Sequence, residues 1–296
     1  MPEEIDASMV RLLVADQFPS WSGLPVAPVP QQGWDNRTFR IGSELSARLP
    51  AGPAYVAAVG KEQRALACLD GCLPVAIPTP VALGSPGHGY PYPWSIRRWL
   101  DGSTVADTPD LDRRQFAHDL GEVLHTLHQL PAETGPAAGR HSHYRGCHPS
   151  AYSDQVDTAL HQLRGTTDAA AAFDDRQCRR IWLDATTHVW PLPPVWFHGD
   201  IAPGNLLTAS GQLSAIIDFG SCGVGDPACD LAIAWTYFAP PERAIFRDAV
   251  RLDEQTWKRA RGWALWKALV TMAGMSSPDP DGTQAQALQE VLGESP

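Results

Sequence analysis

The sequence predicts an α+β protein of two lobes, with a small antiparallel sheet and one main helix in residues 1–100 and a larger, mostly helical region in residues 101–296. The first observation is an alternating apolar pattern on both sides of a short turn within residues 38–49, which is typical of a β-hairpin. The second is a stripe of apolar residues at helical spacing within residues 116–127, and the third is the predominance of helical patterns after residue 230. A chain of 296 residues has room for a core in each lobe.

The first lobe is expected to contain the hairpin, one helix and two further strands. The apolar positions of the hairpin alternate about a turn at residues 42–44 and are Phe39, Ile41, Leu45, Ala47 and Leu49. A helix is predicted over residues 55–69, where apolar residues recur near helical spacing. Strands follow at residues 81–83 and 94–99, separated by turn-forming Gly and Pro residues.

The second lobe is expected to be dominated by helices. Thr108 and Pro109 offer an N-cap followed by proline at the first helical position, ahead of the apolar stripe. Turn-forming residues mark 131–149 as a loop. The remaining predicted elements are helices at 151–163 and 174–190, a β-rich block at 195–219, and helices from 230 onward that include a strong one at 253–272.

Charge and composition narrow the class of partner. The formal net charge of −10 disfavours binding to nucleic acid or an anionic membrane surface, and it suits a cationic small molecule. No stretch of about 18 apolar residues marks a membrane span, and Glu3 and Glu4 precede any apolar segment, unlike the basic start of a signal peptide. The six cysteines are scattered without a CxxC pair, so reduced thiols are expected. We therefore predict a cytoplasmic protein.

The strongest chemical signal is a pair of polar segments beside apolar strands. The first reads His198-Gly199-Asp200 and continues to Asn205, and the second reads Asp218-Phe219-Gly220. Loops flanked by strands hold polar groups in fixed geometry. Asp and Asn oxygens are hard ligands that suit Mg²⁺, which takes few protein ligands and adds substrate phosphates. The two segments together predict a phosphoryl-transfer site.

This ordered pattern resembles the catalytic loop and metal-binding segment of the aminoglycoside phosphotransferase family, which correspond to the catalytic loop and Asp-Phe-Gly segment of protein kinases. The resemblance implies a bilobal protein-kinase-like fold, in which the first lobe binds the nucleotide and the second carries the catalytic and substrate-binding groups. It implies that Asp200 is the catalytic base and that Asn205 and Asp218 hold Mg²⁺. His198 and Asp230 are expected to support the loop. The implied cofactors are ATP or GTP with Mg²⁺.

The resemblance also implies phosphate contacts in the first lobe. Gly33, Asp35 and Asn36 precede the hairpin and form a candidate phosphate loop, although they depart from the Gly-rich motif of protein kinases. Arg48 occupies the position of a phosphate-binding lysine and keeps its positive charge. Glu62 on the following helix is its implied partner.

A hinge between the lobes is implied at Arg98, Trp99 and Leu100, which run from a strand into a turn. Backbone groups there would meet the nucleotide base, so the side chains do not distinguish ATP from GTP. Three plainer interpretations remain open for the first lobe. They are an ordinary turn at 33–36, an ordinary strand end at the hinge, and Arg48 and Glu62 as surface residues.

The acceptor pocket of the family lies between the catalytic loop and the C-terminal helices. Acidic residues bind amines there in members that modify aminoglycosides, which makes Asp154, Asp253 and Glu254 candidate contacts. Each is by default a solvated carboxylate. Ala202-Pro203 replaces the His-Pro of many relatives, which indicates a distinct substrate subgroup.

The implied function is transfer of the γ-phosphoryl group of ATP or GTP to a hydroxyl of an aminoglycoside-like or other antibiotic. A metabolic kinase of a sugar, amino alcohol or ketosamine is the alternative among enzymes, because a shared scaffold does not fix the substrate. A nucleotide-binding pseudokinase is a second alternative, which the complete set of Asp200, Asn205 and Asp218 disfavours. The oligomeric state is not predicted.

Overall fold

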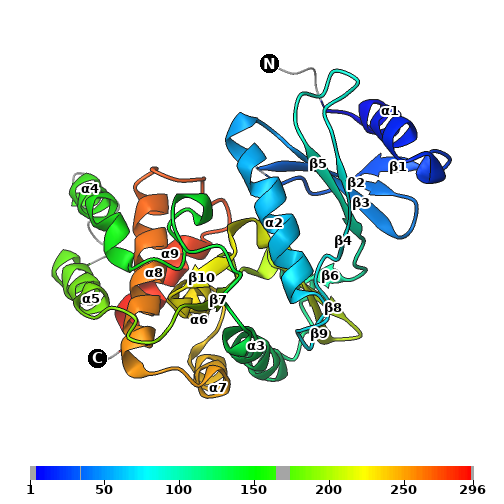
Figure 1. The fold of residues 1–296 in the computed structure, drawn as a ribbon. Helices are drawn as coiled ribbons and strands as arrows, with labels where there is room; N and C mark the ends of the chain where they lie inside the picture. Colours follow the sequence, from blue (N-terminus) through cyan, green and yellow to red (C-terminus); the bar gives the residue numbers. More distant parts are fainter. Residues whose placement is uncertain (1–4, 34, 165–173, 295–296) are drawn as a thin grey trace.

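The computed structural model describes residues 5–33, 35–164 and 174–294, and the chain forms two lobes (Figure 1). A small sheet lobe lies beside a larger helical lobe, and helix α2 runs between them. The predicted two-lobed α+β architecture is therefore confirmed. Glu3, Glu4 and Trp34 lie outside the described residues.

The sheet of the first lobe has five antiparallel strands in the order β1-β2-β3-β5-β4. The strands are β1 (Val26–Pro28), β2 (Asn36–Ile41), β3 (Leu45–Pro50), β4 (Pro80–Gly84) and β5 (Trp94–Arg98). The predicted hairpin forms β2 and β3, and its register pairs Phe39 with Ala47 and Ile41 with Leu45. These four side chains are buried on one face, as the alternation requires.

Two helices flank this sheet, α1 (Ala7–Gln17) and the predicted α2 (Val56–Leu69). Helix α1 was not predicted. Its N-cap is Asp6, whose Oδ1 accepts the backbone N–H groups of Ser8 and Met9 at 2.9 and 2.8 Å. Helix α2 buries Leu66 and Leu69 in the core of the second lobe rather than in that of the first. A first-lobe helix thus packs directly on the second lobe.

The second lobe is mostly helical, as predicted. Its helices are α3 (Arg113–Gln129), α4 (Ser153–Arg164), α5 (Asp175–Thr187), α6 (Ile233–Thr236), α7 (Pro240–Val250), α8 (Glu254–Met272) and α9 (Thr283–Gly293). Helix α8 is buried between neighbouring helices, with Trp263 and Leu265 each at most 3% exposed. Within the described ranges, no helix is long and apolar enough to cross a bilayer.

The predicted start of α3 is wrong. The N-cap is Asp112, whose carboxylate accepts the backbone N–H groups of Arg114 and Gln115, each at 3.1 Å. Thr108 instead turns its hydroxyl to the carbonyl of Thr104 at 2.8 Å and to Thr208. A tertiary contact therefore uses the hydroxyl that the sequence pattern assigned to helix capping.

Short strands of the second lobe frame the polar segments. They are β6 (Ser103–Thr104), β7 (Val195–Phe197), β8 (Leu206–Ala209), β9 (Gln212–Ile216) and β10 (Gly223–Gly225). Strand β7 pairs with β10, and β8 pairs with both β6 and β9. The 198–205 loop therefore connects β7 to β8, and residues 217–222 connect β9 to β10. Both loops are fixed at each end by strand pairing.

Candidate active site

Asp230 holds the start of the 198–205 loop. Its carboxylate accepts the backbone N–H of His198 at 2.7 Å and that of Gly199 at 2.6 Å. The side chain is fully buried, and burial raises the pKa of Asp230 against the opposing effect of these N–H groups. The predicted hydrogen-bonding support of the loop by Asp230 is present.

His198 ties this loop to the segment that carries Asp218. Its Nε2 lies 3.0 Å from the carbonyl oxygen of Ile217, and its Nδ1 accepts the backbone N–H of Asp200 at 3.2 Å. Because Nδ1 accepts, the proton belongs on Nε2, which donates to Ile217. Gly199 adopts φ +87°, and a Cβ there would lie 2.7 Å from the carbonyl oxygen of Ser221. Only glycine fits this turn.

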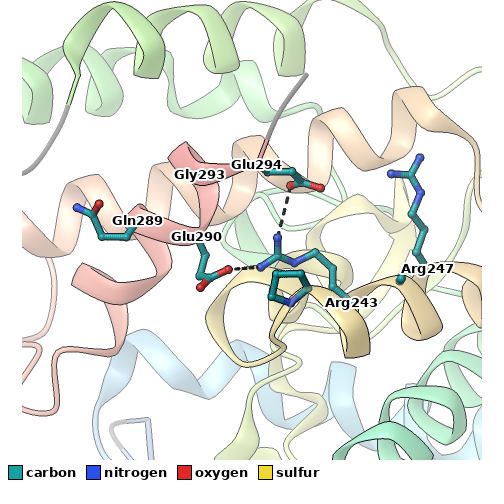
Figure 2. A pocket seen from close by; sticks show the side chains of 8 residues that line it. Arg243, Arg247, Gln289, Glu290, Gly293 and Glu294 are labelled. Carbon is teal, nitrogen blue, oxygen red and sulfur yellow. Dashed lines mark hydrogen bonds and ion pairs between the residues drawn. The ribbon is translucent and has the colours of Figure 1, made fainter.

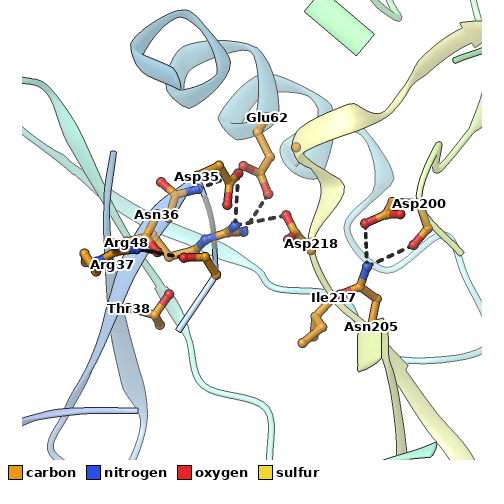
Figure 3. Close-up of polar contacts among 12 residues, drawn as sticks. Asp35, Asn36, Arg37, Thr38, Arg48, Glu62, Asp200, Asn205, Ile217 and Asp218 are labelled. Atoms are coloured by element: carbon orange, nitrogen blue, oxygen red, sulfur yellow. Dashed lines mark hydrogen bonds and ion pairs between the residues drawn. The ribbon is translucent and has the colours of Figure 1, made fainter. Parts of the chain in front are cut away.

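Asp200 and Asn205 are in direct contact. The Nδ2 of Asn205 donates to the Oδ2 and to the backbone oxygen of Asp200, each at 2.9 Å. The carbonyl of Asn205 accepts the backbone N–H of Ile217 at 2.9 Å, so Asp218 follows directly on this link. Figure 3 shows Asp200 and Asn205 on one side of Asp218 and the first-lobe residues on the other. The three side chains with implied catalytic and metal roles are thus brought together.

Asp218 occupies an unusual backbone conformation. Its φ and ψ are 67° and 64°, the left-handed region that Asp and Asn enter more readily than other non-glycine residues. Burial pushes the pKa of Asp218 upward, but the charge of Arg48 and its hydrogen bond lower it to about 2. The carboxylate is therefore ionised at neutral pH and is paired with Arg48 of the first lobe.

Arg48 joins three carboxylates. Its guanidinium lies 3.0 Å from Glu62, 2.9 Å from Asp218 and 4.0 Å from Asp35. The predicted pairing with Glu62 is present, and the side chains of Arg48 and Glu62 are only 13% and 3% exposed, which rules out the plainer interpretation of two surface residues. Burial opposes the charge on Arg48, but the surrounding carboxylates raise its pKa.

Arg97 is a functional neighbour that the sequence analysis missed. Its guanidinium lies 2.6 Å from Glu62, and its side chain is 2% exposed. Burial would raise the pKa of Glu62, but Arg48 and Arg97 together lower it. Alternation along β5 could have identified Arg97, because it shares a face with Ser95, which pairs with Arg48 in the sheet register.

Lys61 is the second missed residue. Its ammonium donates to the backbone carbonyls of Gly220 at 2.5 Å, Cys222 at 3.2 Å and His141 at 3.3 Å. Burial lowers the pKa of Lys61. The sequence carries no signal for this role beyond its position next to Glu62. Helix α2 thus contacts the segment after Asp218 through Lys61.

The candidate phosphate loop turns toward Arg48. The Nδ2 of Asn36 donates to Asp35 at 2.9 Å, and Arg37 donates to the carbonyl of Gly33 at 2.7 Å. Burial raises the pKa of Asp35, and the nearby charge of Asp218 raises it further. Asp35 therefore places a third carboxylate beside the cleft, where the resemblance implied only phosphate donors.

The implied hinge is partly engaged within the first lobe. The backbone N–H of Arg98 donates to Thr79 at 2.9 Å, and that of Trp99 donates to Glu44 at 2.7 Å. The Arg98 side chain is exposed and pairs with Glu44 at 2.9 Å. The backbone N–H groups of Arg98 and Trp99 are therefore already paired within the first lobe. Leu100 is the next residue along the chain.

Two of the three acidic residues considered for the acceptor have partners elsewhere. Asp253 caps α8 by accepting the backbone N–H groups of Gln255 and Thr256. Glu254 pairs with Arg247. Asp154 is exposed in the first turn of α4. Among the described residues, no hydrogen bond or ion pair links these three carboxylates to Asp200, Asn205 or Asp218.

A separate surface pocket lies between α7 and α9 (Figure 2). It has a volume of about 450 Å³, and its Arg243 pairs with Glu290 at 2.7 Å and with Glu294 at 3.8 Å. Its lining residues include none of the residues implied in nucleotide, metal or proton chemistry. This pocket is thus separate from the polar groups that meet where the two lobes come together.

Where the two lobes meet, Arg48 is joined to Asp218 near an Asp–Asn pair on a braced loop, an arrangement typical of kinase-like phosphotransferases. The sequence profile described as the phosphotransferase enzyme family (APH) matches residues 26–263. The chain belongs to this family. The predicted family and the predicted enzyme class, a phosphotransferase, are confirmed. No curated protein matches the sequence significantly.

Several solved structures share the fold. Aminoglycoside 2'-phosphotransferase-IIIa in complex with GDP is similar with a TM-score of 0.69 and 19% identity, over 97% of each chain. The GDP and kanamycin complex of APH(2")-IIia has a TM-score of 0.67 and 20% identity, over 96% of each chain. Macrolide 2'-phosphotransferase MphH from Brachybacterium faecium has a TM-score of 0.64 and 20% identity, over 97% of each chain. The predicted bilobal kinase-like fold is confirmed.

Proposed function

We propose that the chain is a cytoplasmic enzyme that transfers the γ-phosphoryl group of ATP or GTP to a hydroxyl of an antibiotic or similar small molecule. The nucleotide would lie between a nucleotide-binding lobe, residues 1–100, and a catalytic lobe, residues 101–296. The observation that carries this proposal is the linked geometry of Asp200, Asn205 and Asp218. That arrangement supplies a base and two oxygen ligands around one point of the cleft.

Asn205 and Asp218 are the residues that would hold Mg²⁺. Because the Nδ2 of Asn205 donates to Asp200, its Oδ1 is the atom left for a metal ion. Asp218 is anionic at neutral pH, since its pKa is about 2. Both ligands are hard oxygens, so the donor set fits Mg²⁺. When bound, the metal would neutralise charge on the nucleotide phosphates.

Asp200 would orient the acceptor hydroxyl and receive its proton. The side chain is exposed, and its Oδ2 is fixed by Asn205 at 2.9 Å, which aims the carboxylate into the cleft. The hydroxyl oxygen would attack the γ-phosphorus, the bond to the β-phosphate oxygen would break, and the nucleoside diphosphate would leave. His198 and Asp230 position this loop without contacting the reacting atoms.

Arg48 would contact the phosphates from the first lobe. Its two terminal nitrogens already bind carboxylates, and a phosphate presents oxygens of similar geometry. Gly33 and Asn36 would cover the phosphates. Asp35 is the exception, because its carboxylate would repel them, and nucleotide binding therefore requires it to turn away from Arg48 or to take up a proton. Leu100 would meet the base beyond the bonded N–H groups of Arg98 and Trp99.

Antibiotics are the first class of acceptor that we propose. APH(2")-IIia was solved with kanamycin, and MphH is described as a macrolide 2'-phosphotransferase. An aminoglycoside would be cationic and would suit the net charge of −10. A sugar, amino alcohol or ketosamine is the metabolic alternative for the same chemistry.

The test compares Asp200→Asn with wild type, with Asp248→Asn as the control for an exposed carboxylate. Purified protein receives ATP or GTP, Mg²⁺ and panels of aminoglycosides, macrolides and metabolites, and phosphorylated product is measured by mass spectrometry. We expect Asp200→Asn to lower kcat at least ~100-fold with little change in nucleotide Kd. Near-normal turnover of the variant would reject the role of Asp200. Nucleotide binding without transfer to any compound would favour a pseudokinase.

A further inference from the structure

Lys61 is a buried cation that the proposed function does not use. It lies in α2, and the residue is only 6% exposed. Its ammonium donates to the carbonyl oxygens of Gly220 at 2.5 Å, Cys222 at 3.2 Å and His141 at 3.3 Å. Three acceptors match the three N–H donors of a protonated lysine. Within the ranges that the structure describes, Lys61 forms no ion pair with a carboxylate, so backbone carbonyls hold its charge.

Two of these carbonyls belong to the short turn that follows Asp218. Asp218 has left-handed backbone angles, φ 67° and ψ 64°, and the helical turn η7 (Phe219–Ser221) begins directly after it. Gly220 is the middle residue of this turn, and Cys222 is the residue that ends it. Lys61 therefore binds the turn both at its middle and at its end.

Gly220 lies close to the carboxylate of Asp218. A Cβ added to Gly220 would lie 3.3 Å from Oδ1 of Asp218. The same oxygen accepts a hydrogen bond from Arg48 at 2.9 Å. Because a non-glycine residue in the left-handed region is strained, its conformation depends on the contacts that surround it. The contacts of Lys61 with the turn are therefore contacts that hold the Asp218 carboxylate against Arg48.

The backbone before Asp218 is held by other groups. The Nε2 of His198 lies 3.0 Å from the carbonyl oxygen of Ile217, and the N–H of Ile217 donates to the carbonyl of Asn205 at 2.9 Å. All of these groups belong to the second lobe. Lys61 supplies the corresponding contacts after Asp218 and comes from the first lobe. The position of Asp218 thus depends on both lobes.

Glu62, the next residue of α2, binds the sheet of the first lobe. Its Oε1 accepts hydrogen bonds from Arg48 at 3.0 Å and from Arg97 at 2.6 Å. Figure 3 shows Glu62 and Asp218 both directed at the guanidinium of Arg48. Two successive residues of α2 therefore fix this helix to the sheet and to the turn after Asp218.

We propose that Lys61 is a positioning residue of the reaction, whose ammonium holds the turn after Asp218 so that the Asp218 carboxylate keeps the orientation needed for a Mg²⁺–nucleotide complex. The inference rests on the proposed function, in which Asp218 is a ligand of the metal ion. Groups that orient a metal ligand without touching the metal have large effects on its affinity. An apolar side chain could fill the space of Lys61 but could not orient the carbonyls. Its loss should therefore weaken the metal-dependent part of nucleotide binding.

The experiment compares wild type, Lys61→Met and the control Leu66→Val. Methionine fills the space of the lysine stem without the ammonium. Leu66 is a fully buried residue of the same helix, and its replacement by valine perturbs packing but removes no polar contact. If Lys61→Met does not fold, Lys61→Gln takes its place, because glutamine keeps two N–H donors but no charge.

Two measurements are made on each protein. Calorimetry gives the Kd of ADP and of GDP with and without Mg²⁺. Hydrogen exchange of the nucleotide-free protein follows the amides of residues 219–225, where the N–H of Cys222 is bonded within the turn at 3.1 Å. The first measurement reports on the metal-dependent part of binding, and the second reports on the turn itself.

We expect Mg²⁺ to strengthen nucleotide binding in wild type and Lys61→Met to reduce that gain by about 10-fold, with little change in the Kd measured without Mg²⁺. Exchange in the turn should become faster in Lys61→Met. Leu66→Val should keep the full gain and the slow exchange. A purely structural role of Lys61 would instead weaken binding equally with and without Mg²⁺.

That equal loss would overturn the inference, as would an undiminished gain or unchanged exchange in Lys61→Met, or a wild type in which Mg²⁺ adds nothing to nucleotide binding. Failure of the proposed function would look different. Wild type would then bind the Mg²⁺–nucleotide complex but would transfer phosphate to none of the acceptors, as Asp200→Asn does.

Discussion

The guanidinium of Arg48 reaches Asp218 at 2.9 Å across a sequence separation of 170 residues. Arg48 belongs to the sheet of the first lobe, and Asp218 follows the last strand of the β8–β9 hairpin. The same guanidinium binds Glu62 on α2. One side chain therefore couples the position of α2 to the segment that would hold the metal ion.

Replacement of Arg48 by lysine should weaken nucleotide binding. A lysine ammonium cannot reach Glu62 and Asp218 with two separate terminal nitrogens as arginine does. We expect nucleotide Kd, measured by calorimetry, to rise by about 10-fold, in line with loss of one charge-assisted hydrogen bond. Arg11→Lys on the exposed face of α1 should leave Kd unchanged. An unaltered Kd in Arg48→Lys would remove Arg48 from the phosphate site.

Replacement of Asp35 by asparagine should have the opposite effect. Asp35 lies 4.0 Å from Arg48 and raises the negative charge that an incoming phosphate meets. Because asparagine removes this charge, nucleotide affinity should increase several-fold at neutral pH, and the gain should diminish in acid as the wild-type carboxyl is protonated at its raised pKa. Calorimetric titrations at two pH values check both parts. A loss of affinity would instead show that Asp35 assists binding.

Replacement of Asp230 by asparagine should destabilise the fold. The two carboxylate oxygens accept two buried N–H groups, and an asparagine would offer one oxygen and turn an NH₂ group against the second. We expect the free energy of unfolding in urea to fall by about 1–3 kcal/mol. Exposed Asp248→Asn serves as the reference. Equal stability of the two variants would contradict this bracing role.

Acidification should reveal the ion pair of Asp218. Its pKa is lowered from 3.8 to about 2 in the folded protein, so the pair contributes stability above about pH 4 that is lost as pH falls toward 2. The difference in unfolding free energy between wild type and Asp218→Asn, without nucleotide, should shrink over that range. Chemical denaturation at several pH values measures this difference, and a constant or growing difference would argue against the pair.

Local patterns predicted much of the fold. The hairpin, α2, α8 and the β-rich block follow from apolar spacing that tertiary structure reinforces. Helix α1 was not predicted, although its signals are local: Asp6 is an N-cap residue ahead of the apolar stripe Met9, Val10, Leu13 and Val14. The predicted start of α3 was wrong because the hydroxyl of Thr108 contacts that of Thr208, 100 residues away in the sequence. Such a contact leaves no trace in local sequence.

Candidate site residues that belong to sequence motifs could be predicted, whereas residues brought in by packing between distant segments could not. Asp200, Asn205 and Asp218 stand in an ordered pattern that identifies them. Arg97 binds Glu62 of α2, and Lys61 of α2 binds the carbonyl of Gly220. Both contacts depend on how α2 packs against other segments, which no sequence motif encodes.

The left-handed backbone at Asp218 affects how scanning mutagenesis of the cleft should be interpreted. Alanine there would lose the carboxylate and would also face the full cost of the left-handed region at φ 67°, about 1–2 kcal/mol, because it has no short polar side chain to hydrogen-bond locally as Asp and Asn do. Asparagine tolerates this geometry far better and changes mainly the charge. An alanine scan would therefore overstate the chemical contribution of this position relative to Asp200 and Asn205.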